Sequence, residues 1–331
     1  MATMTHDSAV ARQLRSGLTL AILSASSFGL SGSLARGLMN AGWSAASVVA
    51  VRVLLAAVVV LPIALRQLRG DWQLLRRNAS LITAYGLVAV AGTQLAYFNA
   101  VAHMAVGVAL LIEYTAPIAV VGWLWVRYRE RPGAATVAGA ALGITGLFLV
   151  IDLRSGATTS WVGIAWALAA MVGAAGYFVL SAHGDGTLPG SVLAAGGLLI
   201  GGLALLAAGA VGIVPLHATT NPIVFQHFTV PWWPTVLVLG IVTAALSYVT
   251  GIAATRLLGS RLASFVALFE VLSALVFAWA LLGEAPRALQ LLGGALILVG
   301  VIAVRRGEPD TAPATPTIPT DQRRPSAANT N

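Results

Sequence analysis

Residues 123–150 read WLWVRYRERPGAATVAGAALGITGLFLV, and residues 277–304 read FAWALLGEAPRALQLLGGALILVGVIAV. The two stretches align without a gap, and residues that meet in this register are called repeat mates below. The mates that share a letter include Trp125 with Trp279, Glu130 with Glu284, Pro132 with Pro286, Gly139 with Gly293, and Gly146 with Gly300. Shared hydrophobicity alone seldom aligns Trp, Glu and Pro, so the chain contains an internal repeat.

The composition places both copies of the repeat in a membrane. Of the 331 residues, 58% are hydrophobic and 9% are charged, whereas a soluble domain has about 25% charged residues. There is no cysteine, which excludes disulfides and thiolate metal sites. The basic residues lie between apolar segments, where they set orientation and meet anionic lipid, so nucleic acid is not an expected partner. The sequence predicts an all-α integral membrane protein.

Segments long enough to cross a bilayer need about 20 predominantly apolar residues, and the chain offers ten. They are 17–38, 45–65, 79–101, 105–126, 134–151, 161–181, 188–213, 233–255, 260–282 and 287–304. Residues 1–16 form a cytoplasmic N-terminal segment in this interpretation. Residues 305–331 are poor in large apolar groups, which predicts a disordered cytoplasmic tail.

The distribution of Arg predicts the orientation. With the N-terminus inside, only Arg36, Arg154 and Arg287 fall in outer loops, which is a strong positive-inside bias. We therefore expect a multi-pass protein of the inner or plasma membrane with both termini in the cytoplasm. Each repeat, 17–152 and 161–304, then holds five crossings, so the second repeat is inverted. Inverted repeats are typical of proteins that open alternately to either face.

The chain resembles the EamA family of the drug/metabolite transporter superfamily from about residue 17 to 304. The resemblance rests on Arg52 in VVAVRVLLAA, on YFNAVAHMAVGVALLIEYTAP at 97–117, and on LGEAPRALQLLGGALILVGVIAV at 282–304. The IEYTAP stretch at 112–117 is similar to the signature of threonine and homoserine exporters. The resemblance implies ten transmembrane helices in two EamA repeats. Members of the family usually have Glu-Pro in the ninth helix, whereas Val271 follows Glu270 here, so no proline is present to kink that helix.

Two carboxylates lie deep in apolar segments, Glu113 in the fourth and Glu270 in the ninth. Their repeat mates are Ala267 and Ala116, which predicts that the two acids lie one turn apart on the same face of equivalent helices. An ionisable group at such depth costs about 2.5–3.5 kcal/mol on insertion scales, so it usually marks a pathway or a partner. We expect both acids to face a common space; the alternative is a protonated or paired structural acid.

Further polar residues fall in helical register with these acids and could bind substrate or couple protons. The candidate site residues are Glu113, Tyr114, Glu270, Gln94, Tyr97, Tyr248, Ser247, Ser27 and Arg52. The hydroxyl and amide groups could equally be interhelical hydrogen-bond partners. Arg52 could hold a substrate carboxylate, pair with an acid, or snorkel to the outer headgroups. Glu130 and Glu284 are interpreted as loop organisers, with gating as the alternative.

The sequence offers little for an enzyme, because it shows no Gly-rich phosphate loop, metal-ligand cluster or nucleophile triad. We therefore expect no catalytic residues, metal or cofactor. The prediction is a secondary transporter that exports a small polar metabolite, an amino acid or a derivative, by alternating access. The expected partners are a small-molecule substrate, the lipid bilayer and protons, with the protein a monomer or a homodimer. The alternatives are an importer or facilitator of another metabolite or drug, a membrane scaffold, and a membrane enzyme.

Overall fold

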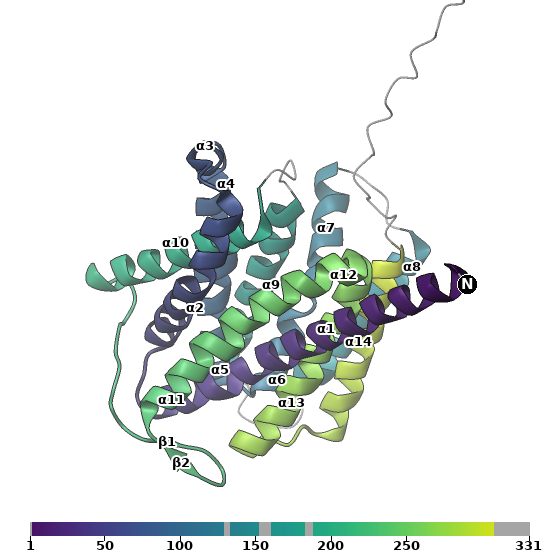
Figure 1. The fold of residues 1–331 in the computed structure, drawn as a ribbon. Coiled ribbons are helices and arrows are strands. Elements are labelled where there is room, and N and C mark those ends of the chain that lie inside the picture. Colours follow the sequence, from purple (N-terminus) through teal and green to yellow (C-terminus); the bar gives the residue numbers. More distant parts are fainter. Residues whose placement is uncertain (1, 129–132, 152–159, 183–187, 308–331) are drawn as a thin grey trace, which may run out of the picture.

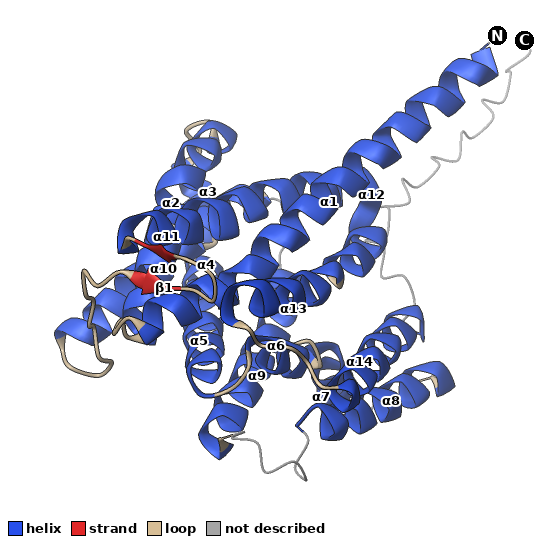
Figure 2. Cartoon of the chain, turned by 90° about the horizontal axis from the view of Figure 1, so that it is seen from below, coloured by secondary structure: helices blue, strands red, loops and turns tan. Residues whose placement is uncertain are grey.

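The computed structural model describes residues 2–128, 133–151, 160–182 and 188–307, and nearly all of them are helical (Figure 1). Seen from below, the helices run in several directions and the only strands among these residues form one small hairpin (Figure 2). Glu130 and residues 308–331 of the predicted tail lie outside the described residues. Helix α1 begins at Ala2, so the segment 1–16 is largely the start of the first helix.

The first half of the chain holds a long opening helix pair and then a series of shorter helices. Its elements are α1 (Ala2–Asn40), α2 (Ala45–Leu68), α3 (Trp72–Arg77), α4 (Ala79–Ala84), the π-helical segment η1 (Tyr85–Gly92), α5 (Thr93–His103), α6 (Val106–Glu113), α7 (Ala116–Tyr128) and α8 (Ala134–Ile151).

The second half repeats this order with one added hairpin. Its elements are α9 (Trp161–Ala182), α10 (Gly190–Ala210), β1 (Ile223–Val224), β2 (Thr229–Val230), α11 (Trp232–Leu237), the π-helical segment η2 (Val238–Leu246), α12 (Ser247–Ala267), α13 (Phe269–Leu282) and α14 (Ala288–Gly307).

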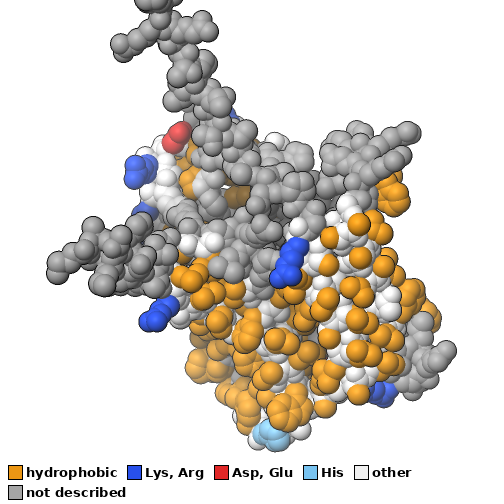
Figure 3. All heavy atoms as spheres, turned by 90° about the vertical axis from the view of Figure 1, so that its right-hand side faces the viewer, with side chains coloured by type: hydrophobic (Ala, Val, Ile, Leu, Met, Phe, Trp, Pro, Cys, Tyr) orange, Lys and Arg blue, Asp and Glu red, His pale blue; other side chains and the backbone are white. Residues whose placement is uncertain are grey.

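Apolar helices occupy all ten predicted segments. Among the residues that the structure describes, five helices are long and apolar enough to cross a membrane: Leu14–Asn40, Ala45–Leu68, Ala79–His103, Gly190–Ala210 and Trp232–Ala254. Five shorter apolar helices occupy the other segments: Val106–Ala119, Ala134–Leu149, Trp161–Gly176, Phe269–Leu282 and Ala288–Ala303. Hydrophobic side chains cover much of the face in Figure 3, as expected of a surface that meets lipid.

Helices α8 and α14 pack through the repeat mates that the sequence aligned. A Cβ atom on Gly146 of α8 would lie 2.5 Å from the carbonyl oxygen of Gly293, and a Cβ atom on Gly300 of α14 would lie 2.5 Å from the carbonyl oxygen of Gly139. The two contacts are reciprocal, because Gly139 and Gly293 are mates and so are Gly146 and Gly300. Side chains larger than hydrogen would separate these backbones, so the glycines permit the close crossing.

The two π-helical segments lie at equivalent positions in the two halves. Each is followed by a hydroxyl that donates to a carbonyl five residues earlier: Thr93 Oγ1 to Val88 O at 2.9 Å, and Ser247 Oγ to Val242 O at 3.1 Å. The donors are repeat mates, and so are the acceptors. Since a π-helix widens the turn and leaves carbonyls poorly paired, the hydroxyls stabilise the same local geometry twice.

The fourth and ninth segments are broken, which corrects their prediction as single helices over 105–126 and 260–282. Residues 114 and 115 interrupt the fourth between α6 and α7, and Leu268 interrupts the ninth between α12 and α13. Pro117, near the start of α7, cannot donate to the preceding turn and favours the first break. The second break occurs without a proline. The eighth and ninth segments were also predicted to be separate, whereas α12 runs on through residue 260.

The β1–β2 hairpin, which was not predicted, packs against the ends of two helices. Ile223 and Phe225 are buried against Gly37 of α1, and the Gln226 N–H donates to the carbonyl of Leu281 in α13 at 2.8 Å. In Figure 1 this hairpin end lies opposite α3, which carries Arg76 and Arg77. The hairpin therefore ties α1 to α13 at one end of the molecule.

Candidate functional site

Glu113 is the last residue of α6 and lies at the break in the fourth segment. Thr115, two residues later, lies in the turn between α6 and α7, and its hydroxyl donates to the carbonyl of Ile112 at 2.6 Å. The Glu113 side chain is half-buried, and no residue that the structure describes donates a hydrogen bond to its carboxylate.

Glu270 lies in the first turn of α13, on the other side of the second break. The hydroxyl of Tyr114 donates to Glu270 Oε2 at 2.8 Å, which joins the two broken segments. Glu270 is near enough to Glu113 for the two charges to interact, whereas the common space that both acids were expected to face stays a prediction. Each acid lies at a helix end rather than inside a continuous helix, and their predicted placement on the same face of equivalent helices stays a prediction.

The helix ends give the two acids different surroundings. The N-terminus of a helix favours a nearby anion and the C-terminus disfavours one, by about 0.3–1 kcal/mol at exposed sites. Glu270 is at an N-terminus and has the Tyr114 donor. Glu113 is the last residue of α6, at its C-terminus. A positive group is therefore the natural ligand of Glu113.

Arg52 on α2 is a buried cation near these acids, and only 2% of its surface is exposed. It donates through Nη1 to Gln94 Oε1, through Nη2 to the carbonyl of Thr243 at 2.9 Å and through Nε to Thr243 Oγ1 at 3.4 Å. The ring of Phe98 lies 5.5 Å away. Snorkelling to the headgroups is therefore excluded for Arg52. Its charge acts on both Glu113 and Glu270 at longer range.

The remaining predicted site residues lie on α1, α5 and α12, and they differ in their contacts. Tyr97 is buried on α5, Ser27 is buried on α1, and Tyr248 packs edge-on against Phe28 with ring centroids 5.3 Å apart. Ser247 is fully buried, and its hydroxyl bonds within its own helix. Its carbonyl accepts from Ser24 Oγ at 2.8 Å, so Ser247 joins α1 to α12 and fits the interpretation of a structural hydrogen bond.

Two contacts of the site were not predicted. Thr243 supplies both its carbonyl and its hydroxyl to Arg52 from within η2, and Phe98 stacks near the guanidinium. The sequence offered one indication of the Thr243 contact, because Thr243 lies in helical register with Ser247. No pattern in the sequence pointed to Phe98.

Glu284, which was interpreted as a loop organiser, holds the start of α6. Its Oε2 accepts from the backbone N–H of Val106 at 2.9 Å. Burial raises the pKa of Glu284 above its ordinary value, while the Val106 N–H and the charge of Arg36 act in the opposite direction. Among the described residues no group of three His, Asp or Glu side chains could hold a metal ion.

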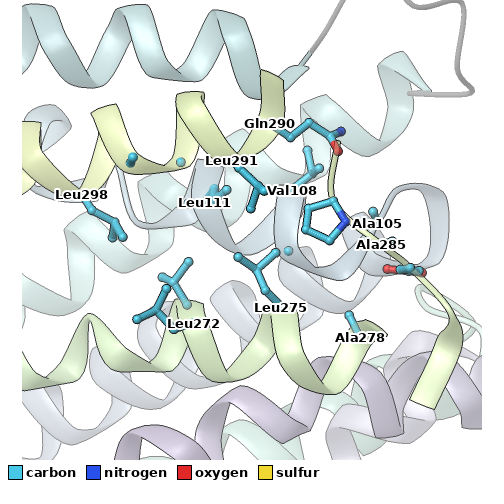
Figure 4. Close-up of a pocket in the computed structure, with 16 residues that line it drawn as sticks. Ala105, Val108, Leu111, Leu272, Leu275, Ala278, Ala285, Gln290, Leu291 and Leu298 are labelled. Carbon is cyan, nitrogen blue, oxygen red and sulfur yellow. The ribbon is translucent and has the colours of Figure 1, made fainter. Parts of the chain in front are cut away.

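Glu284 also lies at a cavity of about 160 Å³ between α6, α13 and α14. Figure 4 shows its mainly apolar lining, with side chains from each helix: Val108 and Leu111, Leu272 and Leu275, Leu291 and Leu298. The cavity lies beside α6, whereas Glu113 is not part of its lining.

Comparison with known proteins gives one family. The sequence profile of the EamA-like transporter family matches residues 15–152 and 161–306. A protein of Archaeoglobus fulgidus described as an uncharacterized transporter is 28% identical over 296 residues, which cover 89% of this chain and 98% of that protein. A protein of known crystal structure is similar in fold, with a TM-score of 0.56 and 21% identity over 88% of this chain and 99% of the other.

Proposed function

Because this chain belongs to the EamA-like transporter family, we propose that it exports a small polar metabolite, an amino acid or a related compound, by alternating access. In this proposal ten helices cross the inner or plasma membrane as two inverted repeats, 17–152 and 161–304, and both termini lie in the cytoplasm. The protein acts as a monomer or a homodimer without a cofactor.

The observation that carries the proposal is the half-buried carboxylate of Glu113 at a helix C-terminus, to which no described residue donates a hydrogen bond. If Glu113 and Glu270 are both ionised, Arg52 balances one of them and leaves one negative charge. The ammonium of an amino acid matches that charge in sign and can donate to Glu113 and to the α6 carbonyls together. A proton on Glu113 would neutralise the same charge, so substrate and proton would compete for one carboxylate.

The site draws on both halves of the chain, as alternating access requires. Gln94 and Glu113 come from the first half, whereas Thr243 and Glu270 come from the second. Both acids lie at helix breaks, and discontinuous helices at the interface between repeats are where many secondary transporters bind substrate. Rocking of one half against the other would expose such a site to each face in turn.

Counterflow in proteoliposomes tests the proposal. Labelled threonine, homoserine, an aromatic amino acid and a sugar are offered to native protein, to Glu113→Gln and to Asp71→Asn at several pH values. Asp71, an exposed helix cap, serves as the control because it lies outside the site. We expect an amino acid to exchange and Glu113→Gln to lower exchange by about tenfold or more, since a charged hydrogen bond contributes about 1.5–3 kcal/mol.

Three results would contradict parts of the proposal. Normal exchange by Glu113→Gln, with its pH dependence intact, would show that the carboxylate is structural and that the site lies elsewhere. Uptake that runs into vesicles only down the substrate gradient, with no response to an imposed pH gradient, would exclude proton coupling. Exchange of the sugar but of no amino acid would reject the substrate class.

A further inference from the structure

The junction between α5 and α6 is held by two side chains of opposite charge. Arg36 Nη1 donates to the carbonyl oxygens of Val101 and, at 2.9 Å, of Met104, where α5 ends. Glu284 Oε2 accepts from the N–H of Val106, where α6 begins. A break leaves carbonyls unpaired at one helix end and N–H groups unpaired at the next. The cation thus meets the carbonyl end and the anion meets the N–H end, which is the favourable sense at both.

These two side chains come from different halves of the chain. Arg36 lies on α1, and Glu284 lies in the link between α13 and α14. Their charges act on each other, and the charge of Glu284 also acts on Tyr97 of α5. Because the same junction is bound from both sides, it connects the two halves at the hairpin end of the molecule.

Helix α6 is buried from Val106 to Ile112 and lies beside the cavity. Gly107, Val108 and Leu111 line the cavity of about 160 Å³ on one side of the helix, where Gly107 also lies close to the side chain of Leu275. Residues 104–105 precede the helix and residues 114–115 follow it, and both pairs are non-helical. An eight-residue helix is about 12 Å long, so a shift at Val106 is transmitted to Glu113 at the other end.

We propose that Glu284 and Arg36 are positioning residues that form a latch on the α5–α6 junction, and that release of this latch lets α6 move into the adjacent cavity and displaces Glu113. The role of Glu113 rests on the proposed function, whereas the latch itself can be tested without transport. Glu284 acts here as a hydrogen-bond acceptor, so its amide analogue retains the latch.

The reactivity of a single thiol on α6 tests the latch. The chain has no cysteine, so Leu111→Cys, which faces the cavity and is 3% exposed, gives one buried thiol. Alkylation by a water-soluble maleimide is timed in this background and with Glu284→Ala, Glu284→Gln or Arg36→Met added. Arg287→Ala, which removes a charge from the same loop, is the matched control.

We expect Glu284→Ala to accelerate alkylation about three- to thirtyfold, the range for loss of a helix cap. Glu284→Gln and Arg287→Ala should react at the native rate. Arg36→Met should accelerate the reaction as well, and it provides an independent route if Glu284→Ala does not fold. Because both residues act on one junction, Arg36→Met combined with Glu284→Ala should give less than the product of the two effects.

Equal rates in all variants would overturn the latch. So would a Glu284→Gln rate as fast as that of Glu284→Ala, because the amide keeps the acceptor. Normal counterflow by Glu113→Gln would reject the proposed substrate site, but it would not change the alkylation rates that test the latch. The two proposals therefore fail by different results.

Discussion

At the scale of single residues, Glu113 and Glu270 show that the same side chain takes a different role at each end of a helix. Glu270 has the N-terminal field of α13 and the hydroxyl of Tyr114 to stabilise its charge. Glu113 has neither, and it adds its charge to the carbonyl end of α6. The acid that lacks stabilising partners is the one that gains most from binding a cation.

Tyr114→Phe removes one donor from Glu270 and keeps the ring. A hydrogen bond to a charged group contributes about 1.5–3 kcal/mol, so we expect the half-saturation concentration in counterflow to rise about tenfold or more. Tyr85→Phe, at the start of η1, is a control for loss of a tyrosine hydroxyl elsewhere. An unchanged half-saturation concentration in Tyr114→Phe would place the Tyr114–Glu270 pair outside the substrate site.

Glu284 predicts a pH dependence of stability. Because burial raises its pKa in the folded protein, the folded state keeps this proton to a higher pH than the unfolded chain. The stability from the protonated form is therefore complete below the ordinary carboxyl pKa and is lost as the pH rises through the raised value. Arg36 and Tyr97 are ionisable groups whose charges interact with that of Glu284. Both are present in the native protein and in a Glu284→Gln variant, so they do not account for a difference between the two.

Glu284→Gln cannot ionise and should escape this loss. We expect its melting temperature in detergent to exceed that of the native protein by a margin that grows as the pH rises above the carboxyl range and vanishes below it. A margin that is constant with pH, or that shrinks as the pH rises, would show that Glu284 is not held with a raised pKa.

At the scale of elements, the π-helical segments place Arg52 and its partners. Gln94 directly follows the cap of η1, and Thr243 lies inside η2. A wider turn shifts the side chains beyond it around the helix axis, so a continuous α-helix would present Gln94 in a different direction. The geometry of the guanidinium site therefore depends on the two hydroxyls that stabilise the π-helical turns.

Thr93→Val and Ser247→Ala remove these hydroxyls from equivalent positions. Each loses a hydrogen bond to a carbonyl, a change of about 0.5–1.5 kcal/mol, and we expect similar decreases in melting temperature for the two variants. Thr145→Val, whose exposed hydroxyl bonds one turn back in α8, serves as the control. A decrease in only one of the two would show that the segments are not equivalent in energy.

The sequence predicted the apolar helices but not the places where they break. Hydropathy and Arg placement locate a crossing because both follow from the bilayer, and they are insensitive to backbone geometry inside it. Leu268 gives no local signal for a break, and it lacks the nearby proline that the fourth segment has. The strands β1 and β2 are two residues each in a polar loop, too short for an alternating pattern.

At the scale of the whole molecule, α8 and α14 join the two halves through reciprocal glycine contacts. Gly146→Ala would place a methyl group 2.5 Å from the carbonyl oxygen of Gly293, and Gly300→Ala would do the same against Gly139. We expect each to reduce stability by about 1–3 kcal/mol, as overpacking does, measured as melting temperature and yield in detergent. Gly122→Ala, which meets nothing within 4 Å, should not reduce it.

The site was only partly predictable because most of it is formed between the halves. The acids could be found, since a carboxylate in an apolar segment is conspicuous in sequence. The bond from Tyr114 to Glu270 and those from Arg52 to Gln94 and Thr243 join residues far apart in the chain. Such pairs depend on how helices pack, and a single sequence carries no information on that.

The halves also differ at the junction of α5 and α6, where residues 104–105 are non-helical, whereas the equivalent residues 258–259 lie inside the continuous helix α12. Two stretches of common ancestry thus hold two shapes in one molecule. In an alternating-access protein, the opposite state is obtained when each half adopts the shape of the other. Under the proposed alternating access, the opposite state would have a continuous α5–α6 and a bend in α12 near residue 258.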